Sequence, residues 1–283
     1  FPICLNTTDI DKFVEIVKMM EPTFGGIILE DIAAPACFEI EKRLSEEMKI
    51  PVFHDDQHGT AIVTLAGLIN ALKVVNKHMD RIRVVINGAG SAGIAIAKLL
   101  LHAGVRDVIL CDSKGAIFEG RTYGMNRTKD EIATVTNQSK LEGSLAEIIP
   151  GSDVFIGVSV EGALTKSMIQ SMNEDPIIFA MANPNPEIMP AEAKMAGAKI
   201  IGTGRSDLPN QVNNVLAYPG LFRGVLNAKA KTITDEMKVT AAYAIAEVIK
   251  DNELSSDYII PNPFDSRVVP SVSEAIFNLV KEN

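Results

Sequence analysis

The segment Gly88–Gly93 limits the fold of this chain more than any other stretch of its sequence, because its glycines match the pattern G-x-G-x-x-G. The run Arg83–Asn87 before it predicts a strand, Ile94–Ala103 after it predicts a helix, and the next predicted strand ends in the acid Asp112. In this setting the first glycine allows a tight turn, the second lets the backbone approach a pyrophosphate, and the third permits close packing of helix and strand. The predicted dinucleotide site comprises Gly88, Ala89, Gly90, Ser91, Ala92, Gly93 and Asp112, whose carboxylate would bind the adenosine ribose.

Alternating apolar runs around this segment predict an α/β fold with a doubly wound parallel sheet. Further strands are expected at 107–112, 153–158, 177–182 and 199–203. Helices are expected near 129–135, 210–225, 232–251 and 269–280. A shorter unit precedes them, with helices at 9–20, 35–48 and 59–75 and strands at 25–29 and 51–53. We therefore predict two domains: residues 1–57, the remainder of a smaller α/β substrate domain, and residues 58–283, a Rossmann-like nucleotide-binding domain with C-terminal helices.

Two acidic pairs, Glu30-Asp31 and Asp55-Asp56, directly follow the two strands of the shorter unit. Open α/β sheets bind their ligands at the carboxyl ends of parallel strands. Adjacent carboxylates raise one another's pKa unless a cation lies between them, and Mg²⁺ and Mn²⁺ prefer such hard oxygen ligands. The pairs therefore indicate a divalent-metal site, with a pair of solvated loop ends as the alternative.

The choice between NAD and NADP depends on the residues around Asp112. A carboxylate at this position favours NAD, because it hydrogen-bonds the ribose hydroxyls. Lys114, Arg121 and Lys129 follow it, and each is near enough in sequence to reach the 2′-phosphate of NADP. The alternative interpretation is three solvated cations on a polar loop.

The composition narrows the class of partner. A formal net charge of −9 argues against nucleic acid and against an anionic membrane as a general partner. No apolar run reaches the roughly 18 residues that span a bilayer. Three cysteines without metal-ligand spacing indicate reduced thiols and a cytoplasmic protein. The chain starts at Phe1 without methionine, as if inside a strand, so we expect further residues upstream.

Five segments resemble those of the malic enzymes, in particular the shorter bacterial and archaeal type, and the similarity runs through the whole chain. They are Leu29-Glu30-Asp31, Phe53-His54-Asp55-Asp56-Gln57-His58-Gly59-Thr60-Ala61, Asn87-Gly88-Ala89-Gly90-Ser91-Ala92-Gly93, Ala182-Asn183-Pro184 and Asn210-Gln211-Val212-Asn213-Asn214. The resemblance implies that Glu30, Asp31 and Asp56 ligate Mg²⁺ or Mn²⁺ and that Asp55 supports the general base.

The resemblance also assigns two asparagines. Asn183 and Asn214 would hold the carboxylates of the substrate, and Asn183 would contact the dinucleotide as well. As alternatives, Asn183 terminates a strand before Pro184, and Asn214 belongs to a turn or a helix cap. We leave His54 out of the catalytic set, and we interpret His58 as a residue at the start of a helix.

The implied activity is the oxidative decarboxylation of (S)-malate to pyruvate and CO₂, with reduction of NAD or NADP by a homodimer. In the family, a lysine base and a tyrosine acid lie upstream of the matching region. We therefore expect this chain alone to have little or no malate turnover.

Three alternatives remain open from the sequence. A malolactic enzyme would use the same fold, metal and NAD but would return the hydride to pyruvate and release lactate. An amino-acid dehydrogenase would rely on lysine and aspartate instead of a metal, which the four acidic residues disfavour. The third alternative is a nucleotide-binding regulatory module without enzymatic activity.

Overall fold

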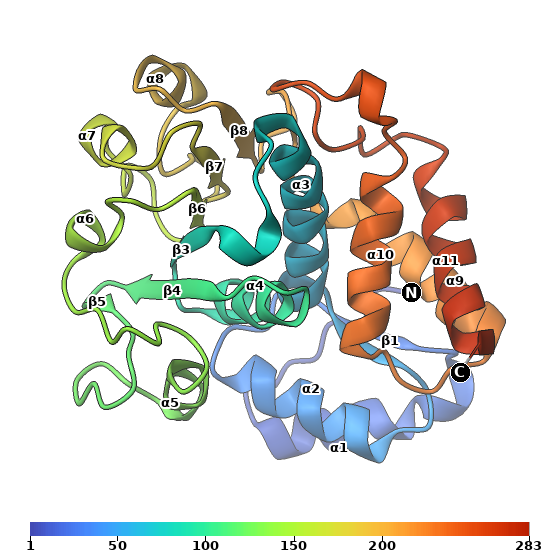
Figure 1. Cartoon of the computed structure of the whole chain (residues 1–283). Coiled ribbons are helices and arrows are strands. Elements are labelled where there is room, and N and C mark those ends of the chain that lie inside the picture. Colours follow the sequence, from blue (N-terminus) through green and yellow to red (C-terminus); the bar gives the residue numbers. More distant parts are fainter. Residues whose placement is uncertain (283) are drawn as a thin grey trace.

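A six-stranded sheet forms the centre of the computed structural model, which describes residues 1–282 (Figure 1). Its strands run in the order β5-β4-β3-β6-β7-β8, and all neighbours pair in parallel except β4 and β5. They are β3 (Arg83–Asn87), β4 (Asp107–Asp112), β5 (Gly115–Ala116), β6 (Val154–Gly157), β7 (Ile177–Ala180) and β8 (Ile200–Thr203). The predicted doubly wound sheet is confirmed, and its strand order reverses between β3 and β6.

Helices cover both faces of this sheet (Figure 1). Because successive strand residues point to opposite faces, Val84 and Ile86 join one apolar cluster, with α3 and α4, and Val85 joins another. The first face carries α3 (Thr60–Val75) and α4 (Ser91–His102). The second face carries α6 (Leu145–Ile148), α7 (Lys166–Gln170) and α8 (Pro190–Met195).

Helix α3 lies at the centre of the molecule and is buried on nearly all sides (Figure 1). With the turn before it, the segment Asp55–Val75 is long and apolar enough to cross a membrane by length and composition. However, 72% of its most apolar window is buried inside the protein, as for the core helix of a globular domain.

Three C-terminal helices follow: α9 (Tyr218–Ala228), α10 (Asp235–Ala246) and α11 (Val268–Glu282). Helix α10 packs against α3, and α11 packs against both α9 and α10. The prediction of a helix from residue 210 was wrong, because α9 begins at Tyr218. Asn210 has a φ of 52°, and its side-chain amide donates to the carbonyls of Ile201 and Ser256. These bonds give the segment an irregular path, which continues into a short 3₁₀ helix, η4 (Asn214–Leu216).

The first part of the chain forms a parallel two-stranded sheet, β1 (Ile27–Leu29) with β2 (Val52–His54). Helices α1 (Ile10–Met19) and α2 (Ala36–Glu47) lie where helices were predicted, and they pack against each other. Val14, Leu29 and Leu44 belong to an apolar cluster of their own. The boundary at residue 57 stays a prediction.

Short elements differ most from the expectations. The helix expected near 129–135 is α5 (Arg127–Ala133). Strand β5 and helix α6 lie on either side of it and were not predicted. The remaining short helices are η1 (Glu21–Thr23), η3 (Met79–Arg81) and η5 (Asp251–Glu253). Such elements are too short to show a hydrophobic period.

Candidate active site

Glu30, Asp31 and Asp56 come together at the carboxyl ends of β1 and β2. Each offers one carboxylate oxygen, and these oxygens all lie within 4.8 Å of one another. The backbone N–H of Asp31 donates to Oδ2 of Asp56 over 2.9 Å, which joins the two strand ends. Asp31 has a φ of 56°, in the left-handed region that Asp tolerates better than most residues. The three predicted metal ligands are therefore neighbours in space.

Asp55 lies beside this group and is almost fully buried, at 6% exposure. The side-chain amide of Asn214 donates to its Oδ2 over 2.8 Å. The other oxygen, Oδ1, is buried and has no hydrogen-bond partner among residues 1–282. Burial and the adjacent charge of Asp56 raise the pKa of Asp55 to about 6. A buried carboxylate oxygen without a partner is uncommon and points to a missing group.

The two adjacent acids diverge because they lie on a π-helical turn, η2 (Asp55–Gly59), that links β2 to α3. Glu41 on α2 fixes this turn from outside. It accepts hydrogen bonds from the backbone N–H of His54 at 3.2 Å and from Nε2 of Gln57 at 3.1 Å, and it pairs with Nε2 of His58 at 2.7 Å. Burial opposes ionisation of Glu41, but its hydrogen bond with His58 and the charges of His58 and Lys238 together outweigh burial and lower its pKa. No local pattern in the sequence indicated this role of Glu41.

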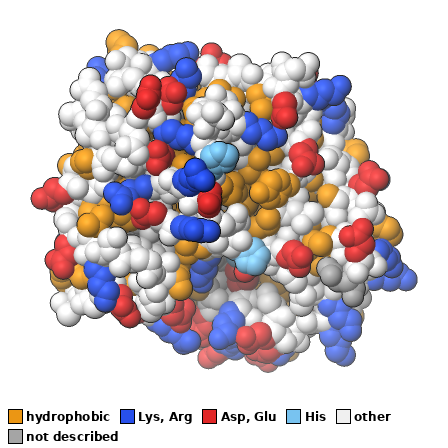
Figure 2. Space-filling view, viewed as in Figure 1, with side chains coloured by type: hydrophobic (Ala, Val, Ile, Leu, Met, Phe, Trp, Pro, Cys, Tyr) orange, Lys and Arg blue, Asp and Glu red, His pale blue; other side chains and the backbone are white. Residues whose placement is uncertain are grey.

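A cavity of about 810 Å³ lies on the other side of the same turn. Its lining includes Gln57 and His58 of the turn, Glu41 of α2 and Lys98 of α4. The surface is recessed between α2 and α4 in Figure 2, where charged side chains of both signs surround the hollow. The turn therefore places Asp55 and Asp56 at the acidic group, and it places Gln57 and His58 at the cavity.

The acidic cluster fits a hard divalent cation. The side chain of Glu30 is exposed, but its carboxyl group is partly desolvated. This desolvation and the charges of Asp55, Asp56 and Asp31 raise the pKa of Glu30 to about 7. The cation would therefore relieve mutual repulsion. The three grouped residues all offer carboxylate oxygens, which Mg²⁺ and Mn²⁺ prefer as ligands. Glu30, Asp31 and Asp56 would hold the ion. His54 is fully buried, and its Nδ1 lies 3.8 Å from Oδ2 of Asp56, too far for a hydrogen bond.

The glycine segment forms the turn between β3 and α4, and α4 begins at Ser91 instead of Ile94. Gly88 has a φ of 121°, a backbone angle that residues other than glycine rarely adopt. A Cβ at Gly93 would overlap the carbonyl oxygen of Gly88, whereas a Cβ at Gly90 would meet nothing within 4 Å. The open space at Gly90, at the N-terminus of α4, leaves room for a pyrophosphate to approach the backbone.

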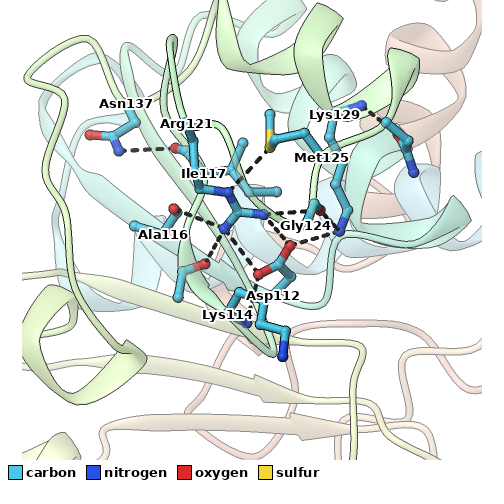
Figure 3. A network of polar contacts seen from close by, with 11 residues as sticks. Asp112, Lys114, Ala116, Ile117, Arg121, Gly124, Met125, Lys129 and Asn137 are labelled. Atoms are coloured by element: carbon cyan, nitrogen blue, oxygen red, sulfur yellow. Dashed lines mark hydrogen bonds and ion pairs between the residues drawn. The ribbon is translucent and has the colours of Figure 1, made fainter.

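Asp112 ends β4 and lies at the centre of a polar network (Figure 3). Arg121 donates to both of its oxygens, at 3.0 and 2.5 Å, and Lys129 donates to Oδ2 at 2.7 Å. Burial opposes ionisation of Asp112, but these bonds and the N–H of Lys114 lower its pKa to about 2. The interpretation of three solvated cations was therefore wrong for Arg121, whose side chain is fully buried.

The two predicted asparagines lie on different loops. Asn214, on η4, contacts Asp55 as described. Asn183 follows β7 and is exposed. Its side-chain amide faces Gly204, where a Cβ atom would lie 3.4 Å from Oδ1 of Asn183. The structure therefore joins Asn214, but not Asn183, to the acidic group.

A doubly wound sheet with a glycine turn at the end of β3 defines a class of nicotinamide dinucleotide-binding oxidoreductases. A profile described as "Malic enzyme, NAD binding domain" matches residues 57–280, and "Malic enzyme, N-terminal domain" matches residues 5–45. The chain belongs to the malic enzyme family.

Named relatives agree with this assignment. The "Bifunctional malic/malolactic enzyme" of Bacillus subtilis (strain 168) is 65% identical over 282 residues, which cover 100% of this chain and 69% of that protein. The "NAD-dependent malic enzyme" of Geobacillus stearothermophilus is 55% identical over 276 residues, which cover 98% of this chain and 57% of that protein. The crystal structure of the NAD-dependent malic enzyme of Thermotoga maritima superposes with a TM-score of 0.94 at 48% identity, covering 98% of this chain and 73% of that one.

Proposed function

We propose that the protein catalyses the oxidative decarboxylation of (S)-malate to pyruvate and CO₂, with reduction of NAD or NADP. The observation that carries this proposal is the group of three carboxylates at one pair of strand ends, in a chain that belongs to the malic enzymes. Asp55, with its unpartnered buried oxygen, lies directly beside that group.

Glu30, Asp31 and Asp56 would bind the divalent ion, which supplies Lewis acidity to the malate hydroxyl and later to the developing enolate oxygen. Asn214 would hold a substrate carboxylate while it also fixes Asp55 through Oδ2. Asp55 would then orient the general base through its remaining oxygen, Oδ1. Such fixed contacts would orient malate for hydride transfer and so lower its entropic cost.

The dinucleotide would bind the turn Gly88–Gly93, with its adenosine over β4 and its nicotinamide over β6 and β7, where Asn183 lies. Asp112 would bind the ribose hydroxyls, which supports NAD. Lys129 is the cation that supports NADP as the alternative, because its ammonium group is already 2.7 Å from Asp112. A 2′-phosphate at this place would compete with Asp112 for Lys129 and Arg121.

We place the lysine base and the tyrosine acid of the family outside this chain. We therefore propose that residues 1–283 bind the dinucleotide and the metal but turn over little or no malate alone. The full-length protein would act on malate as a cytoplasmic homodimer.

Malolactic activity is the second candidate, because the name of the Bacillus subtilis relative includes it. Product analysis with the full-length protein, malate, Mn²⁺ and NAD separates the two activities. Pyruvate formed together with an equal amount of free NADH supports the malic reaction. Lactate without free NADH would instead establish the malolactic reaction, and neither product would refute both.

A further inference from the structure

A buried carboxylate that the proposed mechanism does not use lies at the carboxyl edge of the sheet. Glu187 is fully buried, in the loop after β7. Its Oε1 accepts hydrogen bonds from the backbone N–H of Ser159, at 2.9 Å, and from Oγ of Ser159, at 3.2 Å. Its Oε2 accepts from the backbone N–H of Ala182, at 3.1 Å. One carboxylate therefore joins the loop after β6 to the loop after β7.

The neighbouring residues are adapted to this carboxylate. A Cβ at Gly157, the last residue of β6, would overlap the carboxyl group of Glu187. The side-chain amide of Asn87, at the end of β3, donates to Oγ of Ser159 over 2.8 Å. The contacts thus extend from β3, which leads into the glycine turn, across β6 to β7. Buried carboxylates are costly unless every oxygen is paired, as both oxygens are in Glu187.

The residue after Ala182 is Asn183, which is itself exposed. The strand order reverses between β3 and β6, and a dinucleotide bound there extends to both sides. Its adenosine would lie on the side of β4, where Asp112 is, and its nicotinamide on the side of β6 and β7. The loops that Glu187 joins are therefore those on the nicotinamide side.

We propose that Glu187 is a positioning residue, which fixes the backbone at Ala182 and so holds Asn183 toward the nicotinamide half of the dinucleotide. The proposal rests on the proposed function, in which Asn183 contacts cofactor and substrate. A carboxylate is required because both of its oxygens accept hydrogen bonds. A glutamine has one acceptor oxygen, and its NH₂ group would face an N–H donor at either Ser159 or Ala182.

The test compares two ligands that share the adenosine diphosphate ribose portion. NADH carries the nicotinamide and ADP-ribose does not, so only NADH reports the region near Asn183. Both dissociation constants are measured by calorimetric titration of the 283-residue chain and of E187Q. Glu192→Gln is the matched control, because Glu192 carries a half-exposed carboxylate on α8.

E187Q is expected to weaken NADH binding about tenfold, the loss for one hydrogen bond to a charged group, and to change ADP-ribose binding less than about twofold. E192Q is expected to change neither constant. If E187Q does not unfold cooperatively on heating, Ser159→Ala replaces it. This variant removes the long bond from Oγ to Glu187 and the bond from Asn87 but keeps the backbone N–H bond to Glu187, so a smaller loss of about threefold is expected for NADH alone.

Equal weakening of both ligands would assign Glu187 a merely structural role, and unchanged binding of both would remove any role in binding. Either outcome overturns the proposal and leaves the proposed function standing. If the unaltered chain binds neither ligand, dinucleotide binding itself fails, and both proposals fall together.

Discussion

Asp55 and Asp56 are adjacent in the chain, yet their surroundings differ. Asp56 is half-exposed, accepts the N–H of Asp31 and faces Glu30. Asp55 is buried and bonded to Asn214. Asp112, the acid at the end of β4, is paired with Arg121 and Lys129 (Figure 3). At the scale of the residue, burial and bonding partners therefore distinguish carboxylates that look alike in the sequence.

Asp56→Asn should remove metal binding while leaving the fold intact. The amide is nearly isosteric, and its oxygen still accepts from Asp31. A ligand present at 100 times its dissociation constant stabilises a protein by about 2.7 kcal/mol. We expect Mn²⁺ to raise the midpoint of thermal unfolding of the unaltered chain but not that of the variant. Asp257→Asn, at an exposed position, is the control. An equal Mn²⁺-dependent rise in D56N would contradict the assignment.

Asp112→Asn should destabilise the protein in a pH-dependent manner. The pKa of Asp112 is lowered from 3.8 to about 2, so its stabilising contribution is fully present above pH 3.8 and is lost as the pH falls through 2. A pKa shift of this size contributes about 2 kcal/mol to the free energy of unfolding at pH 7 and roughly half of that at pH 3. Urea unfolding of both proteins at pH 7, 5 and 3 measures it. Asp130→Asn, which alters an exposed residue on α5, should show no such trend, and a constant difference between D112N and the unaltered chain would refute the explanation.

At the scale of the element, the turns after β2 and β3 position the chemistry. The π-helical turn η2 separates Asp55 from Asp56 and depends on Glu41 of α2, 14 residues before Asp55 in sequence. The glycine turn depends instead on its own residues, through the φ of Gly88 and the contact between Gly88 and Gly93. The second turn was therefore predictable from a local motif, and the first was not.

Alanine substitutions at Gly90 and Gly93 should separate binding from folding. In Gly93→Ala, the methyl group overlaps the carbonyl oxygen of Gly88, so we expect a loss of about 1–3 kcal/mol in stability. Gly90 has a φ of −89° and open space around it, so Gly90→Ala should change stability by less than about 0.5 kcal/mol. Its methyl group should nevertheless weaken NADH binding at least about tenfold, because the pyrophosphate needs that space. Unimpaired NADH binding by G90A, measured beside its urea unfolding curve, would contradict this account.

Long, strongly patterned elements such as α1, α2, β3 and β4 were predictable, because each carries its own period, cap or motif. Asp9, for example, is a residue type that favours the N-cap, and it accepts the N–H of Lys12 at the start of α1. The contacts that complete the sites were not predictable, because their partners are distant in sequence. Asn214 meets Asp55 across 159 positions, and Glu187 meets Ser159 across 28. Such pairs form only when the whole sheet assembles, and no local pattern reports them.

At the scale of the whole molecule, this chain combines a metal-binding arrangement on a small parallel sheet with a dinucleotide turn on a large one. Helix α3 joins the two sheets and carries the acidic turn at its start. The family match includes both parts, at residues 5–45 and 57–280. The proposed reaction would therefore require the two sheets to act together, with a metal held at the first and a nicotinamide held at the second.

The most direct test is the initial rate of dinucleotide reduction by the full-length protein with (S)-malate and Mn²⁺, compared for NAD and NADP. We expect a rate that EDTA abolishes and that Mn²⁺ restores. D56N should lower this rate by at least about a hundredfold, because the metal ion no longer stabilises the developing charge. NAD is expected to be the better oxidant, because Asp112 ends β4. A rate that is insensitive to EDTA and retained in D56N would contradict the central claim that these carboxylates hold the catalytic metal.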